Sequence, residues 1–184
     1  MIHHKQRTRR QMLTVLLIFG LLITGCQGLF SADDAYTVEI TGSGVTAPVQ
    51  VSLKQMKEME AGLVEANYFS LNTYGTKEYT DFRGVWLWHL LQESAGLTEN
   101  ARTVTLTAED GYQVSFTLEE VKREDYIDEQ DPAAAYKMII AWEQAGEAFD
   151  PEKGNPFQLV VGQREPGDVN KPYWVRNIST IEVE

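Results

Sequence analysis

The chain has 184 residues, with 16 lysines and arginines against 27 aspartates and glutamates and a formal net charge of −11 at pH 7. An acidic protein lacks the basic surface that releases counterions from phosphates, so this composition excludes nucleic acid as a partner. The length suits one domain of ordinary size, and the single cysteine excludes a disulfide within the chain.

The first 25 residues have the pattern of a secretory signal. They contain four basic residues and no acidic one, and the bases precede an apolar run over residues 12–23. This run is shorter than the roughly 20 residues that are needed to span a bilayer. It ends in the sequence LITGC at residues 22–26, which resembles the bacterial lipobox. The resemblance implies cleavage before Cys26 and transfer of diacylglycerol to its thiol.

These signals predict a lipoprotein that is anchored on the extracytoplasmic side of the cell membrane. Residues 1–25 would be the signal peptide, residues 26–35 a lipidated flexible tether, and residues 36–184 the domain. Acyl chains contribute about 0.8 kcal/mol per buried methylene, so two or three of them hold a protein on a membrane without a spanning helix. The alternative is that Cys26 is an unmodified thiol.

The domain begins with two short strands and a short helix. The predicted strands are residues 36–41 and 49–51, where apolar and polar side chains alternate. A capping box of Ser52 and Gln55 predicts that a helix follows. Residues 63–79 are rich in Tyr, Phe, Thr and Val, which predicts strands around a loop.

The middle of the chain carries the clearest local signals. Apolar residues recur with helical spacing between Gly84 and Gly96, which predicts a buried helix that begins near the first glycine and ends at the second. Residues 103–108 and 112–116 then alternate between apolar and polar. The Asp110-Gly111 pair between these runs is the strongest short-range signal for a β-hairpin.

The remaining residues predict mostly strands and loops. A second capping box, Thr117 with Glu120, starts a helix that ends in a charged run. Many short strands with few helices favour a single β-rich domain of the mixed α+β class. The expected strands are residues 134–142, 156–163 and 173–184, and the expected loops are residues 143–155 and 164–172.

Four motifs in this order resemble the molybdopterin-binding domain of the sulfite oxidase type. They span most of the chain from about residue 49 onward. The resemblance implies a compact α+β fold in which the pterin lies in a cleft and a cysteine thiolate ligates molybdenum. The motifs are residues 82–91 (FRGVWLWHLL), 108–116 (AEDGYQVSF), 155–161 (NPFQLVV) and 174–183 (WVRNISTIEV).

The resemblance places the ligand cysteine within residues 67–80 (NYFSLNTYGTKEYT), but this segment contains no cysteine. Ser70 or Asn72 stands in its place, and neither offers the soft thiolate donor that the family uses. His89 is the only histidine after the signal, and alone it cannot form a histidine-lined pterin site or a zinc cluster. The sequence therefore predicts a relative that binds neither molybdopterin nor a metal.

A group of aromatic and polar side chains on the same segment predicts a reused cleft. Aromatic faces beside amides and hydroxyls suit a small neutral polar ligand, such as a sugar or glycan. The leading prediction is a ligand-binding or interaction module with no catalytic residues. The alternative to ligand binding, for each of these residues separately, is that it is an ordinary half-buried residue of a strand. The candidate residues are Tyr68, Ser70, Asn72, Tyr74 and Lys77, together with Tyr173 and Trp174 from the C-terminal side.

Two other functions stay open at this point. A molybdopterin-dependent oxidoreductase that passes electrons to a membrane partner is supported by the family resemblance alone. A calcium-stabilised adhesion domain is suggested by a cluster of acidic residues, but these lack the spacing of a calcium-binding loop, and a solvated acidic face is the simpler interpretation. The clustered residues are Glu124, Asp125, Asp128, Glu129 and Asp131.

Overall fold

A computed structural model describes residues 32–184, so the predicted signal peptide and the lipidation site Cys26 lie outside the described residues. The end of the predicted tether forms a short helix, α1 (Ala32–Ala35). It lies against α2 (Leu53–Glu58), where Lys57 is 2.8 Å from Asp33. Within residues 32–184, no helix is both long and apolar enough to cross a membrane.

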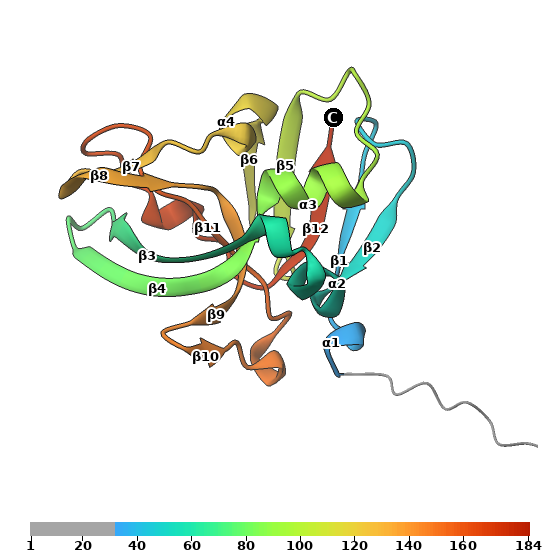
Figure 1. Cartoon of the computed structure of the whole chain (residues 1–184), viewed down its shortest axis with the longest axis horizontal. Coiled ribbons are helices and arrows are strands. Elements are labelled where there is room, and N and C mark those ends of the chain that lie inside the picture. The colour runs from blue at the N-terminus through green and yellow to red at the C-terminus, as the bar shows by residue number, and fades with distance from the viewer. Residues whose placement is uncertain (1–31) are drawn as a thin grey trace, which may run out of the picture. The chain divides into compact units, whose positions relative to one another are not determined.

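Two five-stranded sheets and one two-stranded sheet make up the domain (Figure 1). The first sheet has the order β2 (Val49–Ser52), β1 (Thr37–Thr41), β12 (Ile178–Val183), β5 (Thr103–Ala108) and β6 (Gln113–Thr117). The second has the order β10 (Glu147–Ala148), β9 (Ile139–Gln144), β4 (Lys77–Trp86) and β3 (Leu63–Leu71), and β11 (Gln158–Val160) also pairs with β9. The small sheet pairs β7 (Tyr126–Asp128) with β8 (Asp131–Tyr136).

Short helical segments connect these strands. Between β4 and β5 lies α3 (Leu87–Ser94), and after β6 lies α4 (Leu118–Lys122). Residues 32–184 also contain three single turns of 3-10 helix, which are η1 (Glu60–Gly62), η2 (Pro151–Lys153) and η3 (Lys171–Tyr173). The described part of the chain is therefore rich in strands with few short helices, which confirms the predicted fold class.

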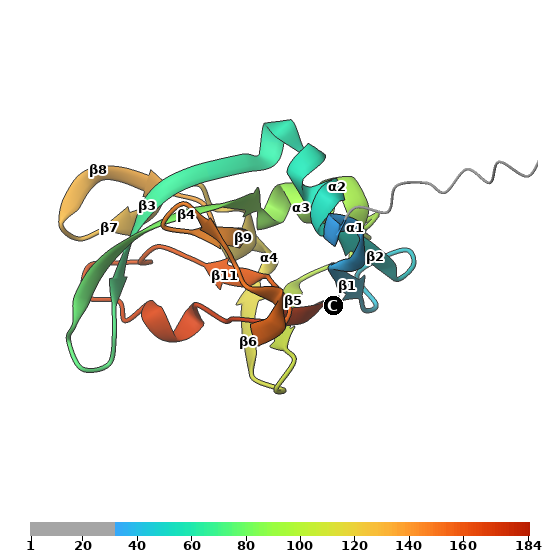
Figure 2. The ribbon, with the colours of Figure 1, turned by 90° about the horizontal axis from the view of Figure 1, so that it is seen from below.

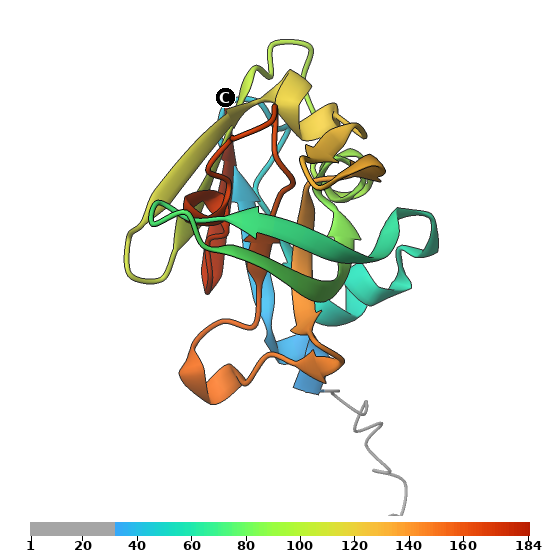
Figure 3. The ribbon, with the colours of Figure 1, turned by 90° about the vertical axis from the view of Figure 1, so that its left-hand side faces the viewer.

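The β3–β4 hairpin is the longest feature of the second sheet. Figure 3 shows it crossing the direction of the strands in the first sheet. Figure 2 shows its turn projecting at one end of the domain, whereas α2 and α3 lie beside its other end. Among residues 32–184, β3 is the last strand of its sheet, so one of its edges has no neighbouring strand in this range.

The core is one cluster of buried side chains from both large sheets and α3. In β5 the buried residues alternate with half-buried threonines, as the sequence predicted. From α3, Leu87, Leu90 and Leu91 are fully buried. Burying one such side chain contributes about 1.5–3 kcal/mol, so the apolar stripe fixes α3 against the sheets.

The most local predictions are confirmed. β5 and β6 pair as an antiparallel hairpin, and Gly111 in its turn has a φ of 86°. Both capping boxes are present, since each cap side chain accepts a hydrogen bond from the backbone three residues on and the reciprocal bond is also made.

The predicted start of the α3 helix was wrong. Gly84 lies within β4, and the helix begins three residues later, at Leu87. At Gly84 the pairing of β4 with β9 shifts register, and a Cβ atom there would lie 2.3 Å from the carbonyl oxygen of Ile140. The glycine therefore permits a close approach of two strands and does not mark a helix end.

Two predictions in the C-terminal part were also wrong. Residues 134–142 form two strands, because β8 ends at Tyr136 and β9 begins at Ile139. The expected loop over residues 143–155 contains the end of β9, the strand β10 and the turn η2. Ala145 and Gly146 form the turn between β9 and β10, and both have a positive φ, which is unusual for alanine and left no clear sequence signal.

Candidate functional site

The segment over residues 67–80, which the sequence equates with the metal-ligand region, forms most of the β3–β4 hairpin. Its turn is held by Asn72, whose side-chain oxygen accepts hydrogen bonds from the backbone nitrogens of Tyr74 and Thr76, both at 2.9 Å. The backbone of Asn72 also donates to Thr76. The amide of Asn72 is therefore engaged in shaping the turn.

Ser70 lies on β3 and is only 1% exposed. Its hydroxyl donates to the backbone oxygen of Glu78 on β4, at 3.4 Å. On the other side of the strand, Asn170 accepts from the nitrogen of Leu71 at 2.8 Å and donates to the oxygen of Phe69 at 2.9 Å. The amide of Asn170 thus bonds the edge of β3 as a neighbouring strand would, at the residues just before and just after Ser70.

Tyr68 belongs to a buried aromatic cluster. Its ring stacks on Tyr136 with centroids 4.8 Å apart and meets the rings of Phe82 and Trp174 edge-on, at 6.2 Å and 6.5 Å. Its hydroxyl donates to the oxygen of Lys137 at 2.8 Å. Burial, with a smaller contribution from Tyr136, raises the pKa of Tyr68 far above its usual range. Tyr68 and Trp174 are therefore brought together, as packed core side chains.

The other candidates lie elsewhere on the surface. Tyr74 is 93% exposed at the hairpin turn, and Lys77 forms an ion pair with Glu129 at 2.7 Å. The ring of Tyr173 packs on Arg164, whose guanidinium also donates to the Tyr173 hydroxyl at 3.0 Å. Of the seven candidates, Tyr68 and Trp174 thus share the core cluster while Tyr74 lies on the exposed turn, and a ligand-binding role for each of them stays a prediction.

The acidic residues near β7 and β8 each interact with other side chains or backbone groups of the domain. Asp128 is 1% exposed and accepts a hydrogen bond from the Tyr79 hydroxyl at 2.8 Å. The ion pair with Lys77, and next the backbone nitrogen of Gly167, lower the pKa of Glu129. Within residues 32–184, no group of three or more His, Cys, Asp or Glu side chains is arranged to hold a metal ion.

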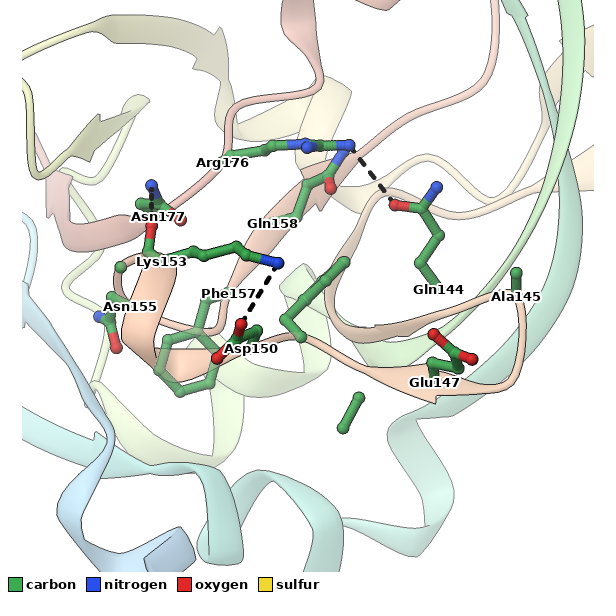
Figure 4. A pocket seen from close by; sticks show the side chains of 13 residues that line it. Gln144, Ala145, Glu147, Asp150, Lys153, Asn155, Phe157, Gln158, Arg176 and Asn177 are labelled. Carbon is green, nitrogen blue, oxygen red and sulfur yellow. Dashed lines mark hydrogen bonds and ion pairs between the residues drawn. The ribbon is translucent and has the colours of Figure 1, made fainter.

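A pocket of about 440 Å³ opens at the end of the second sheet, near the β9–β10 turn (Figure 4). Sequence reasoning missed this pocket because it forms where residues 144–158 fold back against Arg176 and Asn177. Its polar side chains come from the end of β9, from β10, from the turn η2, from β11 and from the residues just before β12. They include Gln144, Glu147, Asp150, Lys153, Gln158 and Arg176.

Hydrogen bonds from Asn155 and Asn177 fix one wall of this pocket, beside the turn η2. Asn155 donates from its side chain to the backbone oxygens of Thr37 and Ile178, at 3.0 Å and 2.6 Å. Asn177 has a φ of 55° and donates from its side chain to the oxygen of Lys153 at 3.3 Å. The wall is thereby joined to β1 and β12 of the first sheet.

Gln158 is the unusual residue of the pocket. It lies on β11, is 3% exposed, and its side-chain oxygen Oε1 has no hydrogen-bond partner within residues 32–184. Buried side-chain oxygens are nearly always hydrogen-bonded, so this atom calls for an explanation. The sequence did hold one signal for it, since Gln158 interrupts an otherwise apolar strand, PFQLVV at residues 156–161.

Neither residue that stands in for the ligand cysteine offers a thiolate. Ser70 offers a buried hydroxyl and Asn72 an amide that is already hydrogen-bonded, whereas the family's ligand is a soft thiolate. The one cysteine of the sequence, Cys26, lies outside the described residues. The ligand set therefore departs from the one that the motifs imply.

Comparisons with known proteins agree with the motifs. The family profile described as "Oxidoreductase molybdopterin binding domain" matches residues 27–184. Among solved structures, the sulfane dehydrogenase SoxCD from Paracoccus pantotrophus resembles the chain with a TM-score of 0.60 and 20% sequence identity, over 83% of this chain and 39% of the SoxCD chain. No curated protein matches the sequence. Because the profile covers most of its length, the chain belongs to the oxidoreductase molybdopterin-binding domain family.

Proposed function

We propose that this member of the family is a lipid-anchored extracytoplasmic binding module that works without molybdopterin. The observation that carries the proposal is the environment of Ser70. Ser70, one of the two residues equated with the ligand cysteine, holds a hydroxyl that is 1% exposed and bonded to the backbone of β4. Such a neutral hydroxyl, whose proton is donated to a backbone oxygen, does not supply the anionic sulfur donor of the family's cysteine.

The surroundings of Ser70 support the same proposal. Asn170 covers the edge of β3 beside it, and Tyr68 next to it is packed among Tyr136, Phe82 and Trp174. These contacts give the segment a structural role that needs no bound pterin. A domain of this kind keeps the family's fold, and its function depends on other sites.

The first test is the metal content of the full chain, produced in a host that synthesises molybdopterin and purified in detergent. We expect molybdenum and tungsten at background level by ICP-MS, and a native mass that equals the polypeptide with its lipid. Ser70→Ala should give the same result. Near-stoichiometric metal with a pterin-sized increase in mass would contradict the proposal, and loss of that metal in Ser70→Ala would identify an oxygen ligand in a molybdopterin-dependent oxidoreductase.

The second test concerns the anchor. We expect the wild-type protein to stay with membranes after a carbonate wash and to carry the mass of acyl chains on a polypeptide that begins at Cys26. Cys26→Ser removes the acceptor thiol, so this variant should lack that mass. Gln27→Ser, a change at the next residue, serves as the control and should be acylated as the wild type is. A Cys26→Ser variant with unchanged mass and membrane association would exclude the anchor.

A further inference from the structure

We propose that the pocket around Gln158 binds a neutral polar molecule that donates hydroxyl or amide hydrogen bonds, such as an N-acetylated sugar unit. This inference rests on the proposed function, because it names the ligand class of the binding module. The pocket volume of about 440 Å³ falls within the range of roughly 300–1,000 Å³ that is typical of small-molecule sites.

The first argument is the unpartnered oxygen of Gln158. This side chain is 3% exposed and lines the pocket, yet its Oε1 accepts no hydrogen bond from the part of the chain that the structure describes. Figure 4 shows it beside Arg176 on one wall of the pocket, across from Lys153 and Asp150. A ligand hydroxyl or amide N–H that reached this oxygen would satisfy a buried acceptor.

The second argument is the balance of charge. The pocket is lined by two basic residues, Arg176 and Lys153, and by two acidic residues, Glu147 and Asp150. Lys153 and Asp150 already form an ion pair at 3.3 Å. With equal numbers of opposite charges, the pocket offers an anion or a cation little net attraction, whereas a neutral ligand can use both donors and acceptors.

The third argument is the mixture of surfaces. Phe149 and Phe157 line the same pocket as the polar groups. Among the described residues, the guanidinium of Arg176 makes one long hydrogen bond, of 3.5 Å, to Gln144, so it can also donate to a ligand carbonyl or hydroxyl. Apolar rings beside amides and a guanidinium match a sugar, which has apolar faces and a rim of hydroxyls.

The experiment measures binding to the full chain in a zwitterionic detergent, because the sugar head group of a maltoside detergent would compete. N-acetylglucosamine is titrated by saturation-transfer NMR, with glucose and glucuronate as further probes. We expect N-acetylglucosamine to bind and glucuronate to bind more weakly. Gln158→Leu should weaken binding about tenfold, since the hydrogen bond to Oε1 is lost. It should leave the unfolding midpoint unchanged or higher, because this oxygen has no protein partner to lose.

Two further variants test whether the pocket is the binding site. Arg176→Ala should also weaken binding, whereas Gln92→Leu, on an exposed position of α3, should bind as the wild type does. The proposal is overturned if the wild type binds neither N-acetylglucosamine nor glucose, if glucuronate binds best, or if Gln158→Leu binds normally. Tighter binding of triacetylchitotriose than of the monosaccharide would identify a glycan chain as the source of the ligand, and equal binding would identify a free sugar.

The outcome is independent of the metal measurement. Metal-free protein that binds no sugar would overturn the pocket assignment and leave the absence of molybdopterin standing. Sugar binding by protein that carries stoichiometric molybdenum would keep the pocket and overturn the proposed function.

Discussion

Replacing Asn170 with alanine is expected to lower the free energy of unfolding by about 3–5 kcal/mol. Asn170 is fully buried. It accepts one hydrogen bond from Leu71 and donates two, to Phe69 at 2.9 Å and to Val161 at 3.0 Å. Alanine would leave the buried oxygen of Phe69 and the partly buried nitrogen of Leu71 without this partner at the edge of β3, and each unsatisfied buried group costs about 1–3 kcal/mol.

Urea unfolding followed by tryptophan fluorescence measures this loss. Asn100→Ala, at an exposed position, is the matched control and should change stability little. Hydrogen exchange gives a local readout, since the amide of Leu71 should exchange faster in Asn170→Ala than amides of the β5–β6 hairpin. A loss of stability no larger than that of the control would mean that water replaces the side chain and that β3 does not depend on it.

Asn170 also illustrates what the sequence could not reveal. It lies 99 residues from Leu71 along the chain, within a segment that the sequence analysis treated as a loop. A polar side chain that takes the place of a strand leaves no periodic pattern. By contrast, the β5–β6 hairpin and the two capping boxes depend on residues a few positions apart, so their sequences were sufficient to predict them.

The glycine at position 84 shows how a local signal can mislead. Its sequence context favoured the start of a helix, but its role is to let β9 approach, with the oxygen of Ile140 only 2.3 Å from where a Cβ would lie. This contact joins segments more than 50 residues apart. Tertiary packing therefore decided a boundary that helical spacing alone placed three residues too early.

The candidate site was predictable in one respect only. The absence of a cysteine from residues 67–80 is visible in the sequence, and it made Ser70 and Asn72 the candidates for the ligand position. The hydrogen bonds of Asn170 on both sides of Ser70 depend on β3 being the last strand of its sheet among the described residues, which only the sheet order reveals. The pocket around Gln158 was missed although two motifs, residues 155–161 and 174–183, contribute to it, because the sequence does not show that they meet residues 144–153, which were predicted as a loop.

The loop between β11 and η3, which carries Asn170, is also stabilised by an ion pair between Arg164 and Asp168. Arg164 donates to both carboxylate oxygens of Asp168, at 2.9 Å each, and its backbone nitrogen donates to the same carboxylate at 3.0 Å. The side chain of Asp168 is 11% exposed. Paired hydrogen bonds between charged groups in such a setting are among the stronger polar interactions, at about 1.5–3 kcal/mol each.

These contacts predict a pH-dependent contribution to stability. The hydrogen bonds from Arg164 hold the pKa of Asp168 below its usual range. Because the folded pKa is lower than the unfolded value of about 3.9, the ionised carboxylate stabilises the fold fully above pH 4 and loses this effect as the pH falls through the folded pKa. Asp168→Asn should therefore cost about 2 kcal/mol at pH 7, and the difference from wild type should shrink below about pH 4.

The measurement is the urea midpoint of the wild type and Asp168→Asn between pH 7 and pH 3. Glu129 also has a lowered pKa and titrates in both proteins, so only the difference between the two curves reports Asp168. Glu165→Gln, at an exposed position of the same loop, should follow the wild type throughout. A difference that stays constant to pH 3 would show that Asp168 acts by shape alone. A difference that closes would show that the ionised pair with Arg164, on which the ring of Tyr173 packs, holds this loop in place.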